Sequence, residues 1–390
     1  MSAKGKNGTG LQKSYSVSDS GHTIEANFTI EVPTDSKRNW GYLSIPLGAK
    51  GLEYSYEAPL KAWEVVYKQD EKVDRVVWDK LPATDEIKQG NTQWASFGNR
   101  YFTTAVVNES EINPDIVLTQ SAVFTGTYLR FPIALKEGQT SVSYKLKIHS
   151  GPKVVTELSK INAKELIDYG MFSVFAYPLL GILRFFFNLV HNYGWAIILL
   201  TLLVRALFYP LSVKSYKSMK AMQKLQPQIA ILKEKYKNDA TRMNQEQMAL
   251  FKTHKVNPMG GCLPMLFQLP VFIALYAVLG NSIELFQAPF FGWVLDLSSK
   301  DPYYIYPVLM GISMFLQQKM TPAVGMDPAQ QKIMLFMPVI FSFMMVSLPA
   351  GLTLYIFVST LLGILQQWAM MREPSSKPAL AIVDPSPKTK

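Results

Sequence analysis

Arg205 is the residue whose position in this sequence most needs a chemical explanation, because it interrupts the apolar run TLLVRALFYP. A charged side chain near the middle of a membrane helix costs at least ~2.5–3.5 kcal/mol, and arginine does not escape by losing its proton. The other apolar segments carry no Asp or Glu that would pair with it. We therefore predict that Arg205 lines a polar, hydrated cavity open to one side. The alternative is that its side chain reaches back to the headgroup region.

Residue types that serve enzymatic chemistry are sparse. The one cysteine, Cys262, excludes an intramolecular disulfide and a cysteine-based zinc cluster. The four histidines are far apart and form no metal-ligand spacing, and the apolar segments hold no paired carboxylates. The sequence contains no P-loop that would indicate a nucleotide-driven step. We predict that the protein is not an enzyme and uses no cofactor or metal.

Five segments in the C-terminal half are apolar and near the ~20 residues needed to cross hydrocarbon. We expect them at about 193–213, 263–283, 304–320, 333–348 and 351–371. The stretch 170–192 before them is rich in aromatic residues but contains Pro178 and Arg184, which favours a helix in the headgroup plane over a spanning one. A large soluble helical core is the alternative, and five such runs disfavour it.

Residues 20–150 show the alternation that is typical of half-buried strands. Ile24–Val32 and Val142–Ile148 alternate apolar with polar side chains. Further short apolar or alternating runs occur at 52–58, 62–67, 73–78, 101–107, 116–124 and 127–135. Many short strands without a helical pattern between them predict an antiparallel β-sandwich. We interpret it as a spacer domain, with a peptide- or lipid-binding cleft as the alternative.

The predicted fold class is a multi-domain membrane protein, with an N-terminal all-β antiparallel sandwich and a C-terminal α-helical bundle of five transmembrane helices. The sandwich is expected over 1–155, and a connector with an interfacial amphipathic helix over 156–192. The five-helix core follows over 193–372 and includes a cytoplasmic helical hairpin at 214–255. A flexible cytoplasmic tail is expected over 373–390.

The distribution of charge predicts the orientation in the membrane. The connection 214–255 holds ten Lys or Arg and three acids, a net charge of +7, whereas 284–303 has a net charge of −2. The positive-inside rule therefore places 214–255, 321–332 and the tail in the cytoplasm. The β domain then lies outside, in the periplasm of a Gram-negative cell. Basic loops beside anionic lipid explain the net charge of +10, so no specific nucleic-acid binding is expected.

Other polar side chains within apolar segments are candidates to line the cavity of Arg205, namely Thr201, Gln268, Ser359 and Gln366. Segment 333–348 carries Met337, Met344 and Met345, whose flexible thioethers suit an adaptable apolar surface. Ordinary lipid-facing or core methionine is the alternative. Sixteen residues span roughly 24 Å, less than the ~30 Å of hydrocarbon, so this segment is expected to thin the bilayer locally.

A resemblance to the bacterial YidC/Oxa1/Alb3 family of membrane protein insertases is carried by LVRALFYPLS, LQPQIAILKEKY, KVNPMGGCLPMLFQLPVFIALY, QAPFFGWVLDLSSKDPYYIYPVLMG, MDPAQQKIMLFMPVIF and PAGLTLYIFVS. It covers about 165–372. The stretch Asn99-Arg-Tyr-Phe-Thr-Thr-Ala resembles the C-terminal part of the periplasmic domain of Gram-negative members. Those members begin with a transmembrane helix and a first part of the sandwich. Neither is recognisable here, so we expect either a misplaced start site or a chain shortened at its start.

The resemblance implies a five-helix core with a hydrophilic groove, open to the cytoplasm and to lipid but closed to the periplasm. Arg205 matches the groove arginine, and Thr201, Gln268 and Tyr355 match groove or substrate-contact positions. Helices 263–283 and 333–348 match a hydrophobic slide for the incoming segment. We assign to this slide Leu269, Met337, Met344, Met345 and Ile356. Ile356 stands where several members have a second tyrosine.

The function that the resemblance implies is insertion and folding of transmembrane segments of nascent proteins in the bacterial inner membrane, with or without the Sec translocon. The implied partners are nascent membrane proteins, the lipid bilayer, the Sec translocon, and the ribosome or targeting factors. A solute transporter or channel is the alternative. It would need a path open to both sides and often shows inverted repeats, and no repeat is visible. A pure chaperone or assembly factor would share the same apolar surfaces.

Overall fold

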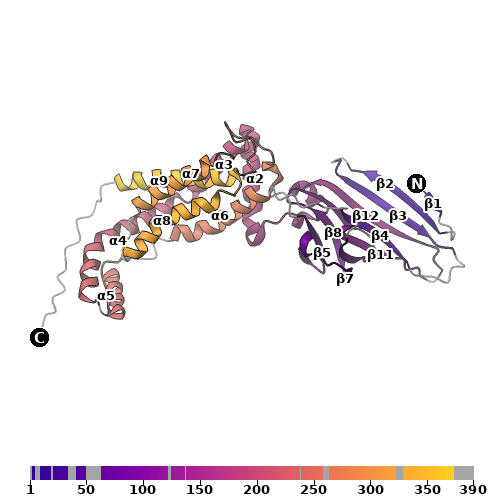
Figure 1. The fold of residues 1–390 in the computed structure, drawn as a ribbon, viewed down its shortest axis with the longest axis horizontal. Helices are drawn as coiled ribbons and strands as arrows, with labels where there is room; N and C mark the ends of the chain where they lie inside the picture. Colours follow the sequence, from indigo (N-terminus) through magenta and orange to yellow (C-terminus); the bar gives the residue numbers. More distant parts are fainter. Residues whose placement is uncertain are drawn as a thin grey trace. The chain divides into compact units, whose positions relative to one another are not determined.

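The computed structural model describes residues 2–372 apart from 5–8, 19–20, 34–40, 50–62, 122–123, 137, 238, 258–262 and 322–327 (Figure 1). The expected strand at 52–58, the tail over 373–390 and Cys262 lie outside the described residues. The chain divides into two compact units. The sandwich unit comprises Met1–Ser173 and Ala277–Phe286, and the helical unit comprises Val174–Tyr276 and Gln287–Lys390.

Two antiparallel sheets form the sandwich unit, as the sequence predicts. The larger sheet has the order β1-β2-β3-β12-β9-β8-β5-β6, with β1 Ser2–Lys4, β2 Gly10–Val17, β3 Thr23–Glu31, β5 Glu64–Gln69, β6 Lys72–Val77, β8 Thr92–Gly98, β9 Phe102–Asn108 and β12 Ser141–Pro152. The smaller sheet has the order β4-β11-β10-β7, with β4 Tyr42–Ala49, β7 Glu86–Lys88, β10 Asp115–Gln120 and β11 Thr125–Pro132.

Side-chain alternation explains which strands the sequence reveals. In β3, Ala26, Phe28 and Ile30 are buried in the core, while the residues between them are more exposed. Their partners across the β3–β12 pair alternate in the same way, so Tyr144 lies opposite Phe28 inside the core. Strand β8 was not predicted, because it is buried along almost its whole length and therefore shows no alternation.

The connector after the sandwich is mostly short helical turns. It contains α1 Val155–Lys160 and the 3₁₀ turns η3 Lys164–Leu166 and η4 Gly170–Phe172, and a further turn, η2 Trp78–Lys80, lies within the sandwich. Helix α2, Ser173–Val190, follows and contains Pro178. The helical pattern expected over 156–168 therefore extends over one short α-helix and one 3₁₀ turn.

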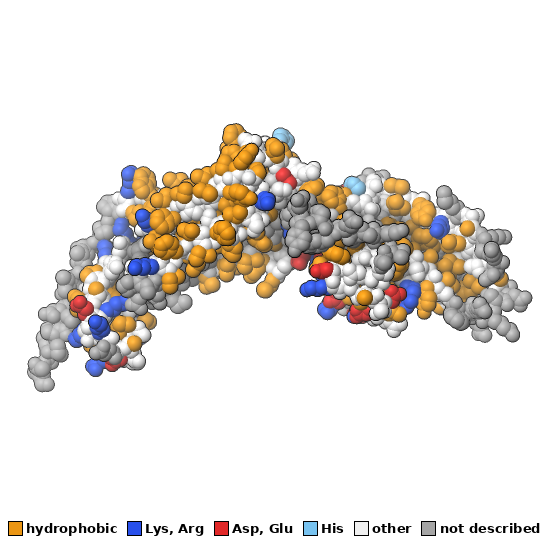
Figure 2. Space-filling model, viewed as in Figure 1, with side chains coloured by type: hydrophobic (Ala, Val, Ile, Leu, Met, Phe, Trp, Pro, Cys, Tyr) orange, Lys and Arg blue, Asp and Glu red, His pale blue; other side chains and the backbone are white. Residues whose placement is uncertain are grey.

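The remaining helices coincide with the predicted apolar segments and hairpin. They are α3 Tyr193–Leu207, α4 Tyr209–Lys235, α5 Ala240–Thr253, α6 Leu263–Asn281, η6 Ile283–Leu285, α7 Ile305–Met320, α8 Pro328–Met345 and α9 Ala350–Arg372. Figure 2 shows hydrophobic side chains covering the visible face of the long helices, with Lys and Arg gathered where α4 and α5 lie.

Length and composition alone identify few membrane-spanning helices within the described residues. Gly170–Val190 and α9 are each long and apolar enough to cross a membrane. Helices α3 and α4 count as a third span only if they are taken together across a bend of 59°. The apolar parts of α6 and α8 are shorter. Five crossings therefore stay a prediction, as does an interfacial position for 170–192.

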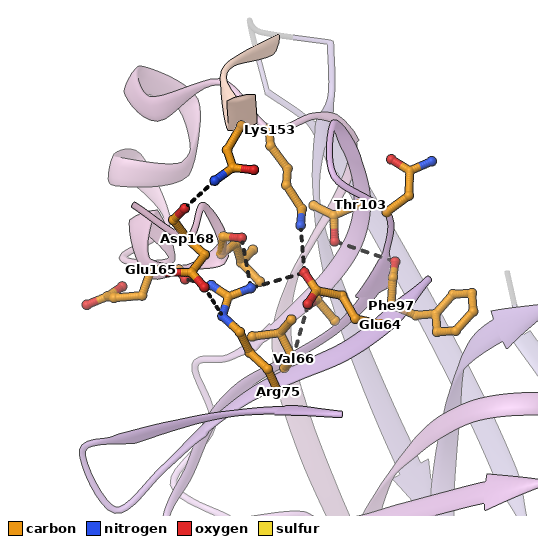
Figure 3. Close-up of polar contacts among 12 residues, drawn as sticks. Glu64, Val66, Arg75, Phe97, Thr103, Lys153, Glu165 and Asp168 are labelled. Carbon is orange, nitrogen blue, oxygen red and sulfur yellow. Dashed lines mark hydrogen bonds and ion pairs between the residues drawn. The ribbon is translucent and has the colours of Figure 1, made fainter. Parts of the chain in front are cut away.

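A cluster of charged side chains joins the sandwich to the connector (Figure 3). Lys153 is only 3% exposed, and its Nζ donates to Oε1 of Glu64 at 3.3 Å. Nη1 of Arg75 donates to the same oxygen at 3.0 Å, and Nη2 of Arg75 donates to the carbonyl of Glu165 in η3. Burial lowers the pKa of Lys153, and the nearby Glu64 opposes that shift.

The C-terminal end of α6 packs against the same part of the sandwich unit. Nδ2 of Asn281 donates to the carbonyl of Asp168 at 2.8 Å. The rings of Tyr101 and Phe286 lie 5.0 Å apart, centroid to centroid. Because Tyr101 belongs to the Asn99-to-Ala105 stretch that the sequence singles out, that stretch serves at least to hold this helix end.

We expect Glu64→Gln to lower the free energy of unfolding of the sandwich unit by about 3 kcal/mol, because buried Lys153 then loses its paired carboxylate and Arg75 keeps only the more distant Asp168, at 3.8 Å. The loss should shrink as the pH rises toward the ordinary pKa of lysine, because burial lowers the pKa of Lys153, which then sheds its proton while Arg75 stays charged. Hydrogen–deuterium exchange of β5, β6 and β12 measures both effects.

The matched control for this prediction is Glu86→Gln, which removes the exposed partner of Lys88. Exposed ion pairs contribute little to stability, so exchange should hardly change in this variant. Equal acceleration of exchange in the two variants would contradict the interpretation of Glu64 as the counter-charge of a buried cluster.

Candidate functional site

Arg205 lies in the last turn of α3. At the other end of this helix, the side chain of Asn192 accepts a hydrogen bond from the backbone N–H of Gly194 at 2.9 Å. A bend of 59° separates α3 from α4, and Pro210 occupies the first turn of α4, where proline is favoured. The predicted segment 193–213 is thus not one straight helix. Arg205 is therefore close to a helix C-terminus, whose carbonyls stabilise a cation.

Ser359 of α9 supplies the hydrogen-bond acceptors of the Arg205 guanidinium. Nε donates to Ser359 Oγ at 3.2 Å, and Nη2 donates to the same oxygen at 2.9 Å. Nη2 also donates to the backbone carbonyl of Ser359. In the described part of the chain no carboxylate forms a salt bridge with Arg205. Ser359, one of the polar residues predicted to line the cavity, therefore supplies neutral oxygens to the guanidinium from a neighbouring helix, and hydration of the cavity stays a prediction.

Tyr355 and Gln268 lie on the same side of the bundle as the guanidinium. Tyr355 is 2% exposed, and its hydroxyl lies near Gln268, Ser359 and Arg205. This hydroxyl is buried and makes no hydrogen bond of ordinary geometry with a described residue. Gln268 is half-buried. The structure thus brings three of the four predicted groove residues close together.

Thr201 is the fourth predicted groove residue, one turn before Arg205 in α3. It is 1% exposed, and its hydroxyl donates to the carbonyl of Ile197 at 2.6 Å. Its polar group is therefore satisfied within its own helix. Contact of Thr201 with a substrate stays a prediction.

Gly363 and Gln317 lie beside Arg205 but were not predicted. A Cβ atom added at Gly363 would lie 2.7 Å from Nε2 of Gln317 and 3.3 Å from Nη2 of Arg205, so both groups pack against bare backbone. Tyr355, Ser359 and Gly363 follow one another at four-residue intervals and therefore share a face of α9. That spacing, and a glutamine inside apolar α7, were the signals available in the sequence.

The predicted slide residues divide into an exposed and a buried group. Leu269 of α6 and Met337 and Met344 of α8 are about half exposed, whereas Met345 and Ile356 are buried. Helix α8 adds further exposed apolar side chains, namely Ile333, Phe336, Val339, Ile340 and Phe343. An apolar surface on α8 is therefore present, and its role as a path for an incoming segment stays a prediction.

The basic hairpin predicted over 214–255 is formed by α4 and α5. Leu225 and Ile229 of α4 pack with Phe251 of α5 in a small buried cluster. The side chain of Asp239 accepts the backbone N–H of Arg242 at 2.9 Å and so caps the start of α5. Most of the lysines of this pair are exposed, and Figure 2 shows Lys and Arg gathered in this region.

The connection between α6 and α7 fixes the starts of two helices. Asp301 is 1% exposed and accepts hydrogen bonds from Nε1 of Trp293 at 3.0 Å and from the backbone N–H of Tyr306 at 2.7 Å. The N–H of Ala350 donates to the carbonyl of Ser299 at 2.7 Å. The beginnings of α7 and α9 are therefore held by one connection, which also fixes how their polar residues face α3.

This connection also packs on the start of α3, where the ring of Phe290 lies directly on Gly194. A Cβ atom at position 194 would come 2.0 Å from Cδ2 of Phe290, so Gly194→Ala requires the ring to move. We expect the substitution to lower the free energy of unfolding by about 1–3 kcal/mol, and Phe290→Ala in the same chain to remove the clash. Thermal unfolding of the detergent-solubilised chain measures this effect.

Gly181→Ala in α2 is the control for this prediction, because a Cβ atom there meets nothing within 4 Å. Alanine is the better helix former, so this variant should be neutral or slightly more stable. A loss of stability at Gly181 equal to that at Gly194 would show that the contact with Phe290 is not the cause.

Comparison with known proteins covers both units of the chain. Residues 1–182 match the family model for the YidC periplasmic domain, and residues 185–377 match the family model for the 60Kd inner membrane protein. A crystal structure of an active YidC insertase with its first transmembrane domain resolved aligns with 96% of this chain and 94% of that one, at 22% identity and a TM-score of 0.45.

Several curated relatives are membrane protein insertases named YidC. That of Geotalea daltonii is 43% identical over 92% of this chain and 68% of its own length. That of Geotalea uraniireducens is 51% identical over 71% of this chain and 53% of its own, and that of Syntrophus aciditrophicus is 47% identical over 83% and 59%. The chain thus spans between about half and two-thirds of the length of these relatives.

Proposed function

We propose that this chain, which belongs to the YidC family of membrane protein insertases, inserts transmembrane segments of newly made proteins into the bacterial inner membrane. The observation that carries the proposal is the guanidinium of Arg205, held between apolar helices by a neutral serine. Because no carboxylate among the described residues pairs with it, this charge can still attract an oppositely charged group.

The energy for insertion comes from the incoming segment itself. A helix of ~20 apolar residues gains about 6–12 kcal/mol on entering the bilayer, at ~0.3–0.6 kcal/mol per residue. The barrier lies in moving the polar flank of this segment through hydrocarbon. A polar site around Arg205 shortens that path, and Gln268 and Tyr355 add further polar groups beside it. No nucleotide is then needed for the step.

The apolar surface of α8, with Leu269 of α6, is the proposed exit path. Exposed Met337 and Met344 are flexible and polarizable, so the same surface can pack against segments of different shape. The incoming helix then passes from polar contacts with Arg205 to apolar contacts, and finally to lipid.

The proposed orientation follows from charge. The basic hairpin α4–α5 faces the cytoplasm, where it is placed to meet the ribosome or targeting factors, and the sandwich unit faces the periplasm. Cooperation with the Sec translocon is part of the proposal. Exposed Lys217, Lys235 and Lys252 support it, because positive charge on the surface of the hairpin attracts anionic partners.

We expect Arg205→Ala to reduce the insertion of segments with acidic flanks about fivefold for each acidic residue, while uncharged flanks lose little. The measurement is insertion into sealed vesicles that contain the purified chain, with substrates whose flanks carry a graded number of aspartates. Lys319→Ala, which removes an exposed cation from the end of α7, is the control and should not change the charge dependence.

Equal losses across the graded series would remove the electrostatic role of Arg205. The same vesicles also test the alternative of a transporter or channel. Flux of small solutes that depends on the chain, without insertion of any segment, would contradict the proposed function.

A further inference from the structure

The donors of the Arg205 guanidinium are already partly occupied. Arginine binds a carboxylate with two parallel hydrogen bonds either through Nε and one Nη or through both Nη atoms. Ser359 accepts from Nε and from Nη2, so it engages an atom of each of these two edges. A carboxylate that approaches Arg205 therefore meets one nitrogen, Nη1, that Ser359 does not use.

The position of the guanidinium depends on the absence of a side chain at Gly363. Nη2 and Nη1 of Arg205 lie 3.3 and 3.5 Å from the place that a Cβ atom of Gly363 would take, and Nε2 of Gln317 lies 2.7 Å from it. Gly363 is itself buried. A methyl group at this position would displace the amide of Gln317, because a distance of 2.7 Å is shorter than van der Waals contact. It would also crowd the guanidinium, which lies slightly farther away.

We propose that α9 sets how strongly Arg205 attracts an incoming segment, with Ser359 as a resident acceptor that competes with acidic groups and Gly363 as the space in which the guanidinium and Gln317 lie. This inference rests on the proposed insertase function. Ser359 and Gly363 are positioning residues, since both act through Arg205. They act in opposite directions: Ser359 weakens the attraction for acidic flanks, and Gly363 maintains it.

The two positions therefore give effects of opposite sign in one experiment. The 390-residue chain is reconstituted in sealed vesicles of phosphatidylethanolamine and phosphatidylglycerol, and two substrates are compared that differ only by Asp or Asn in one flank. The quantity measured is the ratio of insertion of the Asp substrate to that of the Asn substrate. Ser359→Ala should raise this ratio about threefold, because one competing acceptor is removed.

Gly363→Ala should lower the same ratio about threefold, because the guanidinium moves away from its position. Adding Gln317→Ala to this variant removes the side chain that the new methyl group meets first, so most of the ratio should return. A purely structural role of α9 would instead lower insertion of both substrates together and leave their ratio unchanged.

Gly311→Ala is the matched control on α7. A Cβ atom there would lie 2.7 Å from Oγ of Ser342, which is as close a contact as that at Gly363 but involves a different helix pair. This variant should leave the ratio unchanged. Thermal unfolding confirms that each variant is folded. Should Gly363→Ala not fold, Ser359→Ala decides the question alone, because it deletes a single oxygen atom.

The outcomes separate this inference from the function on which it rests. If the unmodified chain inserts both substrates but Ser359→Ala leaves the ratio unchanged or lowers it, the inference is overturned and the insertase function stands. If the unmodified chain inserts neither substrate, the proposed function fails, and the inference fails with it. A raised ratio in Ser359→Ala together with a lowered ratio in Gly363→Ala supports the inference.

Discussion

A guanidinium that cannot lose its proton needs oxygen acceptors wherever it lies among apolar helices. The helical unit meets this need with a hydroxyl and a carbonyl of Ser359 rather than with a carboxylate. A carboxylate would satisfy the donors and also cancel the charge. Neutral oxygens satisfy donors while the positive charge persists. In the proposed mechanism, the exposed apolar surface of α8 follows this site, because an apolar segment packs there after its polar flank has been drawn to Arg205.

In the sandwich unit, buried and half-buried cations are paired with a carboxylate. Lys153 and Arg75 share the carboxylate of Glu64, and Asp168 lies 3.8 Å from Nε of Arg75, so two carboxylates face the two cations within the fold. This cluster attaches the connector to the sandwich, because Arg75 donates hydrogen bonds to carbonyls of the connector that leads to α2. Among the described residues, Glu64 gives its cluster the character of a structural ion pair, whereas the proposed function needs the charge of Arg205 to stay available for a substrate. The presence or absence of an acidic partner is the distinguishing feature.

Sequence periodicity predicted strands that bury one face, such as β3 and β12, and missed β2, β4 and β7 as well as β8, which is buried on both faces. Arg205 was predicted because a charge within an apolar run is visible locally. Ser359 was among the polar residues expected to line the same cavity, but its direct hydrogen bonds to Arg205 were not predicted, because it lies 154 positions away and serine is common where helices pack. The break after α3 was likewise not predicted, although Pro210 signals the start of a new helix.

Arg205 lies at the end of α3 and not in the middle of a longer straight helix, so the carbonyl end of α3 helps to stabilise its charge. Its surroundings then combine the carbonyl end of α3, the Ser359 face of α9 and the Gln317 side of α7. The connection that caps α7 and pairs with the start of α9 holds these helices from their other ends. The position of one charge therefore depends on loop contacts distant from it. Substitutions such as Gly194→Ala should consequently alter the charge dependence of insertion as well as stability.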